Sequence, residues 1–98
     1  DYAMTVVMAA NGYPEDYKKF TSINNLENLT LTKDEYLFHA GTILKENKWL
    51  SNGGRVLNIS STGKDLKTIR ETIHEVINQI NWNEGYYRKD IGWRYIHE

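Results

Sequence analysis

The chain has 98 residues, of which 40% are hydrophobic and 26% charged, a composition that fits one small folded domain and excludes a disordered chain. Its 12 Lys and Arg residues against 13 Asp and Glu residues give a formal net charge of −1, which lacks the positive field that non-specific binding to nucleic acids or anionic membranes needs. The absence of cysteine excludes disulfides, thiolate nucleophiles and cysteine-ligated metal sites.

The longest apolar stretch, residues 4–10, is far too short to cross a bilayer, and the start of the chain does not resemble a signal peptide. The sequence therefore predicts a cytoplasmic location and no membrane partner. The chain begins at Asp1 without an initiator methionine and enters an apolar run almost at once, which is typical of a domain cut from a longer polypeptide.

The first third of the chain predicts one clear strand. Residues 5–10 form a short apolar, β-branched run that ends at the turn sequence 11–14, which indicates a buried strand. Pro14 followed by acidic residues favours a brief helix or helical turn over residues 15–19. The asparagine-rich residues 21–32 favour a loop that leaves room for one short strand.

The middle of the chain predicts more β-structure. Residues 36–40 indicate a strand, and residues 42–45 and 48–51 flank Glu46-Asn47 like the arms of a hairpin. Asn52-Gly53-Gly54 then breaks the chain before a further buried strand, residues 55–60, which a turn at residues 61–63 is expected to end.

The last third predicts one main helix, from about Asp65 to Ile80. Asp65 is a candidate N-cap, and Thr62 an alternative one. A final extended segment is expected over residues 86–96. This order of elements predicts an α+β fold, a small curled antiparallel sheet packed by that helix. The apolar positions of the helix recur at steps of three and four: Leu66, Ile69, Ile73, Val76, Ile77 and Ile80.

The best candidate for chemistry is Gly53-Gly54-Arg55, a candidate substrate-binding segment. Residues without side chains let backbone N–H groups approach an anion, and the following guanidinium offers a bidentate contact to a phosphate or carboxylate. The plainer alternative is that the glycines only turn the chain and that Arg55 is solvated or pairs with an acid.

Arg88-Lys89-Asp90 is a second basic spot, and the aromatic residues near it allow stacking of nucleic-acid bases as an alternative. Completion of a small core is the stronger interpretation of these residues, so no nucleic-acid partner is predicted. The neighbouring aromatic residues are Tyr86, Tyr87 and Trp93.

No metal, catalytic or cofactor-binding residue is predicted. His39, His74 and His97 share no ligand spacing, and His39 is expected to find a backbone partner within a strand. The sequence contains no nucleophile elbow, no phosphate loop and no dinucleotide fingerprint, and no pair of its acids is placed for general acid–base work.

Four segments, taken in order, resemble the carboxy-terminal domain of phosphoribosylamine–glycine ligases. They are residues 5–14 (TVVMAANGYP), 38–42 (FHAGT), 52–57 (NGGRVL) and 87–93 (YRKDIGW), and the predicted helix lies between the third and the fourth. The resemblance spans nearly the whole chain. It implies one domain over residues 1–98, with the small barrel-like hybrid fold that closes the carboxy end of ATP-grasp ligases.

The resemblance also implies a function. The full-length enzyme joins glycine to 5-phosphoribosylamine with ATP in purine synthesis, through phosphorylation of glycine to an acyl phosphate. ATP and magnesium are then bound by an ATP-grasp domain, which together with an amino-terminal domain is the expected partner of this chain. The isolated domain is expected to be inactive and to complete the substrate cleft, with Gly53, Gly54 and Arg55 holding a substrate anion.

Two alternatives stay open at this point. One is a free-standing interaction or small-anion-binding module that has the same fold. The other is the equivalent domain of a different ATP-grasp ligase, such as a carboxylase, against which the segment 87–93 argues because it resembles the glycine ligase.

Overall fold

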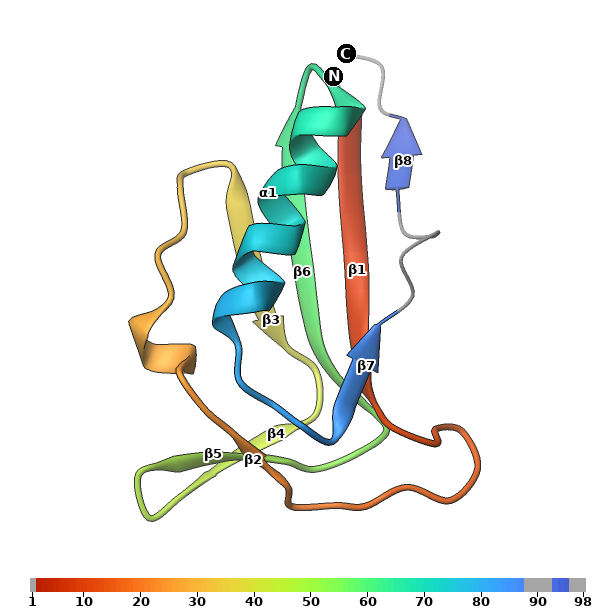
Figure 1. Ribbon diagram of the computed structural model, residues 1–98, viewed down its shortest axis with the longest axis vertical. Coiled ribbons are helices and arrows are strands. Elements are labelled where there is room, and N and C mark those ends of the chain that lie inside the picture. Colours follow the sequence, from red (N-terminus) through yellow and green to blue (C-terminus); the bar gives the residue numbers. More distant parts are fainter. Residues whose placement is uncertain (1, 88–92, 96–98) are drawn as a thin grey trace.

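The structure is a computed structural model that describes residues 2–87 and 93–95 (Figure 1). One helix of 14 residues, α1 (Leu66–Gln79), packs on a mostly antiparallel β-structure, and a single 3-10 turn covers Leu26–Asn28. The strands are β1 (Tyr2–Ala10), β2 (Ser22–Ile23), β3 (Glu35–His39), β4 (Thr42–Lys45), β5 (Lys48–Ser51), β6 (Arg55–Gly63), β7 (Gly85–Tyr87) and β8 (Trp93–Tyr95). The predicted α+β class is confirmed.

The larger sheet has the order β3-β6-β1-β7, and β8 also pairs with β1. All of its pairings are antiparallel. The long strands β1 and β6 form its centre, while β7 and β8 pair with opposite ends of the same edge of β1 (Figure 1). The sheet of the described residues is open, with β3 at one edge, so it does not form the closed barrel that a barrel-like fold would suggest.

The helix α1 forms because its sequence separates an apolar face from a polar one. Asp65 is its N-cap and accepts a hydrogen bond from the Lys67 amide at 3.3 Å, which satisfies one of the free N–H groups of the first turn. The Thr68 hydroxyl donates to the other oxygen of the same carboxylate at 2.7 Å. The predicted helix and its Asp65 cap are both confirmed.

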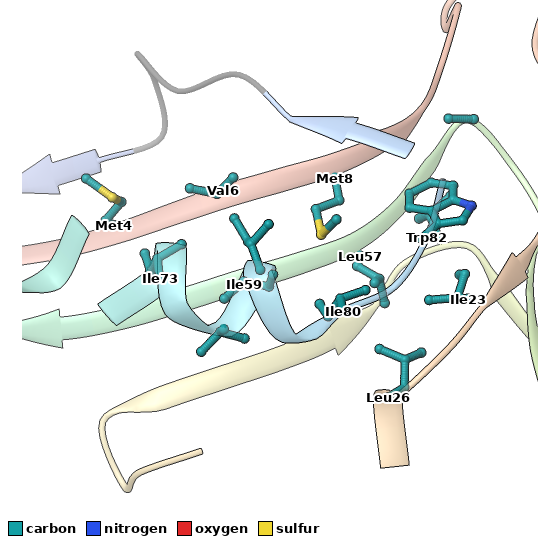
Figure 2. Close-up of a cluster of buried hydrophobic side chains, with 14 of the residues drawn as sticks. Met4, Val6, Met8, Ile23, Leu26, Leu57, Ile59, Ile73, Ile80 and Trp82 are labelled. Atoms are coloured by element: carbon teal, nitrogen blue, oxygen red, sulfur yellow. The ribbon is translucent and has the colours of Figure 1, made fainter. Parts of the chain in front are cut away.

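The core lies between α1 and one face of the larger sheet (Figure 2). Met4, Val6 and Met8 alternate along β1 on the side of the helix, as strand geometry requires, and meet Ile73 and its neighbours on α1. Trp82 and Ile23 extend the core toward the smaller sheet. Burial of such side chains is the main favourable term in folding.

The smaller sheet, of order β2-β5-β4, contains the predicted hairpin. Residues Glu46 and Asn47 join β4 to β5 with φ angles of 51° and 65°, the left-handed conformation that a two-residue hairpin turn needs. The short strand β2 within the asparagine-rich segment is also confirmed.

A β-bulge interrupts the pairing of β1 with β6. Met8 pairs with Leu57 but Ala9 pairs with Arg55, so Val56 is an extra residue in β6. Residues opposite each other in an antiparallel pair point to the same face, and Ala9 follows Met8, which faces the helix. The bulge therefore places Arg55 on the face opposite α1.

Two predictions about local structure are wrong. Residues 15–19 form no helix, because the amides of Tyr13 and Glu15 donate to the carbonyls of Ala10 and Gly12 in consecutive tight turns. Residues 61–63 form no turn either. They continue β6 because the start of β1 pairs with them, Tyr2 with Gly63 and Met4 with Ser61.

The predicted final extended segment is confirmed where the structure describes it, in β7 and β8, and its remaining residues, 88–92 and 96, lie outside the described residues. Among the described residues, none of the helices has the length and apolarity that a bilayer span requires.

Candidate functional site

Four segments far apart in the sequence meet at one end of the larger sheet, at the bottom of Figure 1. They are the end of β1 with the turn after it, the end of β3, the loop before β6 and the start of β7. The first three sequence motifs lie at these places. Of the fourth motif, Tyr87 stands at the end of β7 and Trp93 in β8, which pairs with the other end of β1, and residues 88–92 fall outside the described residues. The loop of Gly53 and Gly54 stands at the centre of this cluster.

The loop is tied to β1 on one side. The Ala10 amide donates to the Gly54 carbonyl at 2.7 Å, and Ala9 pairs with Arg55 one step further along. The conformation at Gly53 has φ 142°, which residues with a side chain rarely adopt. Glycine at this position is therefore a backbone requirement.

The loop is tied to the end of β3 on the other side. The Asn52 amide donates to the Gly41 carbonyl at 2.8 Å, and the amides of Ala40 and Gly41 both donate to the Val56 carbonyl, at 3.0 and 3.1 Å. A methyl group on Gly41 would overlap the Arg55 carbonyl oxygen. Gly41 is thus a glycine because the loop backbone passes directly over it.

The turn after β1 closes the cluster. A methyl group on Gly54 would overlap the ring of Tyr13, so this ring lies directly against the loop backbone. The Tyr86 hydroxyl on β7 donates to the Tyr13 carbonyl at 3.3 Å, and the Asn11 amide donates to the Glu84 carbonyl at 2.8 Å. Each side of the loop is therefore packed by another motif.

The groups of this cluster that have no partner among the described residues suit an anion. Arg55 is exposed, and no ion pair joins its guanidinium to a carboxylate among residues 2–87. Within the same residues, the amides of Gly53 and Gly54 donate to no backbone or side-chain acceptor. Two uncommitted N–H groups next to an uncommitted guanidinium form a candidate anion-binding site.

The plainer alternative has two parts. Among the described residues no acid pairs with Arg55, whereas a role of the two glycines in turning the chain is compatible with the geometry. A hollow of about 320 Å³ lies beside the cluster, and its wall carries charges of both signs, with Lys18 and Glu84 3.8 Å apart. The residues that line it are Asn11, Asp16, Tyr17, Lys18 and Glu84.

The other predicted candidates are not brought into this cluster as functional groups. His39 lies at the end of β3, where its Nδ1 is 2.8 Å from the Thr42 hydroxyl and its ring centroid is 4.4 Å from that of Trp49. Its partner is thus a side chain and not the expected backbone group. His74 Nδ1 on α1 is 3.1 Å from the Tyr87 hydroxyl.

The aromatic residues near the second basic spot have structural contacts. Tyr87 packs its ring edge-to-face with His74 at 5.7 Å on the helix side of the sheet, and Tyr86 is committed to Tyr13. Arg88, Lys89 and Asp90 lie outside the described residues, as does His97. In the described part of the chain, no three His, Asp or Glu side chains gather as a metal ion requires.

The sequence predicts the loop as a candidate site, but it predicts neither Tyr13, which packs on the loop, nor Tyr86, which donates to the Tyr13 carbonyl. Tyr13 belongs to the first motif, and its contact with Gly54 joins residues 41 positions apart. The only local signal was the absence of a side chain at position 54, which does not say what fills the space.

Comparison with known proteins identifies the family. The family model "Phosphoribosylglycinamide synthetase, C domain" matches residues 3–94. The phosphoribosylamine–glycine ligase of Brucella melitensis biotype 1 is 47% identical over 94 residues, which are 96% of this chain and 22% of the relative. The chloroplastic phosphoribosylamine–glycine ligase of Arabidopsis thaliana is 46% identical over 100 aligned positions, covering all of this chain and 19% of the relative.

The fold agrees with a solved structure of the same kind. A crystal structure of the phosphoribosylamine–glycine ligase from Thermotoga maritima matches with a TM-score of 0.74 at 34% identity, and the match covers 92% of this chain and 22% of that one. The chain thus spans about a fifth of the length of the relatives it matches. The resemblance seen in the four motifs is confirmed, and the chain belongs to the family of phosphoribosylglycinamide synthetase C domains.

Proposed function

We propose that this chain works as the carboxy-terminal domain of a phosphoribosylamine–glycine ligase of purine biosynthesis. The observation that carries the proposal is the family match over residues 3–94, together with identities of 46–47% to relatives that bear this name. Its partners are then the amino-terminal and ATP-grasp domains of the same polypeptide. A cytoplasmic location belongs to the same proposal.

The proposed reaction proceeds in two steps. A carboxylate oxygen of glycine attacks the terminal phosphorus of ATP and ADP leaves. The amino nitrogen of 5-phosphoribosylamine then attacks the acyl carbon and gives up one proton to solvent, and inorganic phosphate leaves with the electron pair of the broken C–O bond. Both steps bring several anions together, so fixed cationic and N–H groups that offset this charge lower the barrier.

ATP and magnesium are assigned to the rest of the longer polypeptide. Among the described residues no three acidic or histidine side chains gather, and the sequence has no phosphate loop, so no residue of this chain is proposed as a ligand of magnesium or ATP. By itself the 98-residue chain is expected to be inactive, and no step of the reaction is assigned to a metal that it holds.

Within the longer polypeptide, Arg55 and the amides of Gly53 and Gly54 are proposed to hold the 5-phosphate of phosphoribosylamine. Among the described residues the two amides and the guanidinium have no acceptor, which supports this role because a phosphate oxygen accepts hydrogen bonds from both kinds of donor. The bulge in β6, which turns Arg55 to the face away from α1, presents it to a neighbouring domain.

The catalytic part of the proposal is tested on the native polypeptide that carries this segment. Purified from its source, it should form glycinamide ribonucleotide only when glycine, ATP and phosphoribosylamine are all present. The 98-residue chain alone should give no product in the same assay. A native polypeptide that folds but forms no product with these substrates would overturn the assignment.

The anion site is tested by Arg55→Ala in the same polypeptide. Loss of a hydrogen bond to a charged group costs about 1.5–3 kcal/mol, so the apparent KM for phosphoribosylamine should rise about tenfold or more. Arg55→Lys should recover only part of this loss, because an ammonium group cannot make the bidentate contact. Arg70→Ala, which removes an exposed arginine on α1, is the matched control. An unchanged KM in Arg55→Ala would rule out the role of this residue.

A further inference from the structure

The ring of Tyr13 fills the space in which a side chain at position 54 would lie. A methyl group on Gly54 would overlap three of its ring carbons, Cδ1, Cε1 and Cγ. Gly54 is itself buried, whereas Arg55, the next residue, is exposed. The ring therefore presses on the loop backbone immediately before the residue that is proposed to hold the anion.

Tyr13 is in turn held on both sides of its own backbone. Its amide donates to the Ala10 carbonyl at 3.0 Å, and its carbonyl accepts the Tyr86 hydroxyl at 3.3 Å. Its ring also packs edge-to-face with Tyr17, with centroids 5.7 Å apart. The position of the ring is thus set by β1, which pairs with the strand of Arg55, and by β7, which pairs with the other edge of β1.

Gly41 supports the same loop from the other side. A methyl group on Gly41 would overlap the Arg55 carbonyl oxygen, and it would lie 3.2 Å from the Asn52 carbonyl oxygen. The loop backbone is consequently held between the Tyr13 ring and the backbone of Gly41. Two successive glycines would otherwise give this segment more conformational freedom than any other residue pair.

We propose that Tyr13 is a positioning residue for Arg55. Its ring fixes the backbone of Gly53 and Gly54 against Gly41, so that the two free amides and the guanidinium converge on one anion. Tyr13 itself makes no contact with that anion. The proposal rests on the proposed function of Arg55 and adds the residue that orders its site. Such a residue favours binding, because preorganised donors need no ordering when the anion binds.

The test measures coupling between Tyr13 and Arg55 in the native polypeptide. Tyr13→Ala should raise the apparent KM for phosphoribosylamine about threefold to tenfold and leave the KM for ATP unchanged, because a misplaced group loses part of its binding energy. Tyr13→Phe, which keeps the ring, should restore the KM to that of the parent. In the Arg55→Ala background, Tyr13→Ala should add no further increase.

Tyr86→Phe provides a second variant in case Tyr13→Ala does not fold. It removes only the hydrogen bond to the Tyr13 carbonyl and should raise the same KM by about twofold to threefold, again without a further effect in the Arg55→Ala background. Tyr36→Ala, on the exposed edge strand β3, is the matched control and should change no KM.

The outcomes separate this inference from the one it rests on. One outcome is that Arg55→Ala raises the KM, while Tyr13→Ala either leaves the KM unchanged or adds its full increase in the Arg55→Ala background. Tyr13 then does not position Arg55, but the anion site itself stands. If Arg55→Ala leaves the KM unchanged, the anion site fails and the positioning role fails with it. A KM that stays high in Tyr13→Phe would also contradict the proposal, since it would assign the effect to the hydroxyl.

Discussion

At the scale of single residues, the Arg55 loop owes its shape to glycines whose missing side chains make room for other groups. Gly41 leaves space for the carbonyl of Arg55, and Gly54 leaves space for the ring of Tyr13. The sequence alone singles out Gly53-Gly54-Arg55, because adjacent glycines before an arginine have local chemical meaning. It does not reveal Tyr13 or Gly41 as neighbours, since those contacts depend on how the strands pair.

Gly41→Ala should destabilise the chain by about 1–3 kcal/mol, because the added methyl group meets a backbone carbonyl that the sheet holds in place. Gly63→Ala is the matched control. Its methyl group would stand 3.3 Å from Cγ1 of Ile69, a side chain able to move slightly, and its cost should be below about 1 kcal/mol. Urea unfolding of the two variants measures the difference, and equal free energies of unfolding would contradict the packing described for Gly41.

The N-cap of α1 predicts a specific response to acid. The hydrogen bond from Thr68, followed by that from the Lys67 amide, lowers the pKa of the Asp65 carboxyl from its ordinary value of 3.8. A lowered pKa in the folded state means that Asp65 stabilises the fold above pH 3.8 and that this contribution is lost as the pH falls below 3.8 through the folded-state value.

Asp65→Asn keeps an efficient cap but removes the titration. The variant should therefore lose less of its thermal stability than the parent when the pH is lowered from neutral to below 3.8. Thermal unfolding of both proteins, followed by circular dichroism across this range, measures the difference in stability. The contributions of the other carboxylates are the same in both proteins and cancel in that difference. Identical pH profiles for the two proteins would show that Asp65 does not contribute.

At the scale of elements, regular patterns were predictable and non-local pairing was not. The spacing of apolar residues predicts α1 to within a residue at each end, and Glu46-Asn47 marks the hairpin. The end of β6 was predicted too early, because its last residues are strand through pairing with distant residues, Tyr2 and Met4 on one side and Glu35 on the other. The helix expected at residues 15–19 is absent because tight turns at Tyr13 and Glu15 take its place.

Packing of α1 on the sheet should dominate the stability of the domain. Ile73 is 1% exposed and lies on the buried face of the helix, so Ile73→Ala should cost about 2–5 kcal/mol. Ile43→Ala makes the same change at a residue of the smaller sheet that is 37% exposed, and should cost less than about 1 kcal/mol. Chemical denaturation of both variants provides the measurement. A loss at Ile43 as large as that at Ile73 would contradict the placement of the core.

At the scale of the whole molecule, the fold class was predictable because one amphipathic helix among short strands leaves few ways to bury the apolar residues. The site was predictable only in part. The loop with Arg55 was predicted, whereas the bulge that turns Arg55 away from α1 and the meeting of the first three motifs at one sheet end follow from strand register. Register depends on pairing across the whole chain, and no local pattern in this sequence encodes it.

The mass of the native polypeptide is the first quantity to measure, because it decides whether this chain works as one domain of a longer ligase. Antibodies raised against the 98 residues, used with intact mass spectrometry on extracts of the source cells, report this mass. We expect a polypeptide about five times as long as the chain, because the chain spans about a fifth of its relatives. A native product of only 98 residues would contradict the ligase function and leave a free-standing anion-binding module in its place.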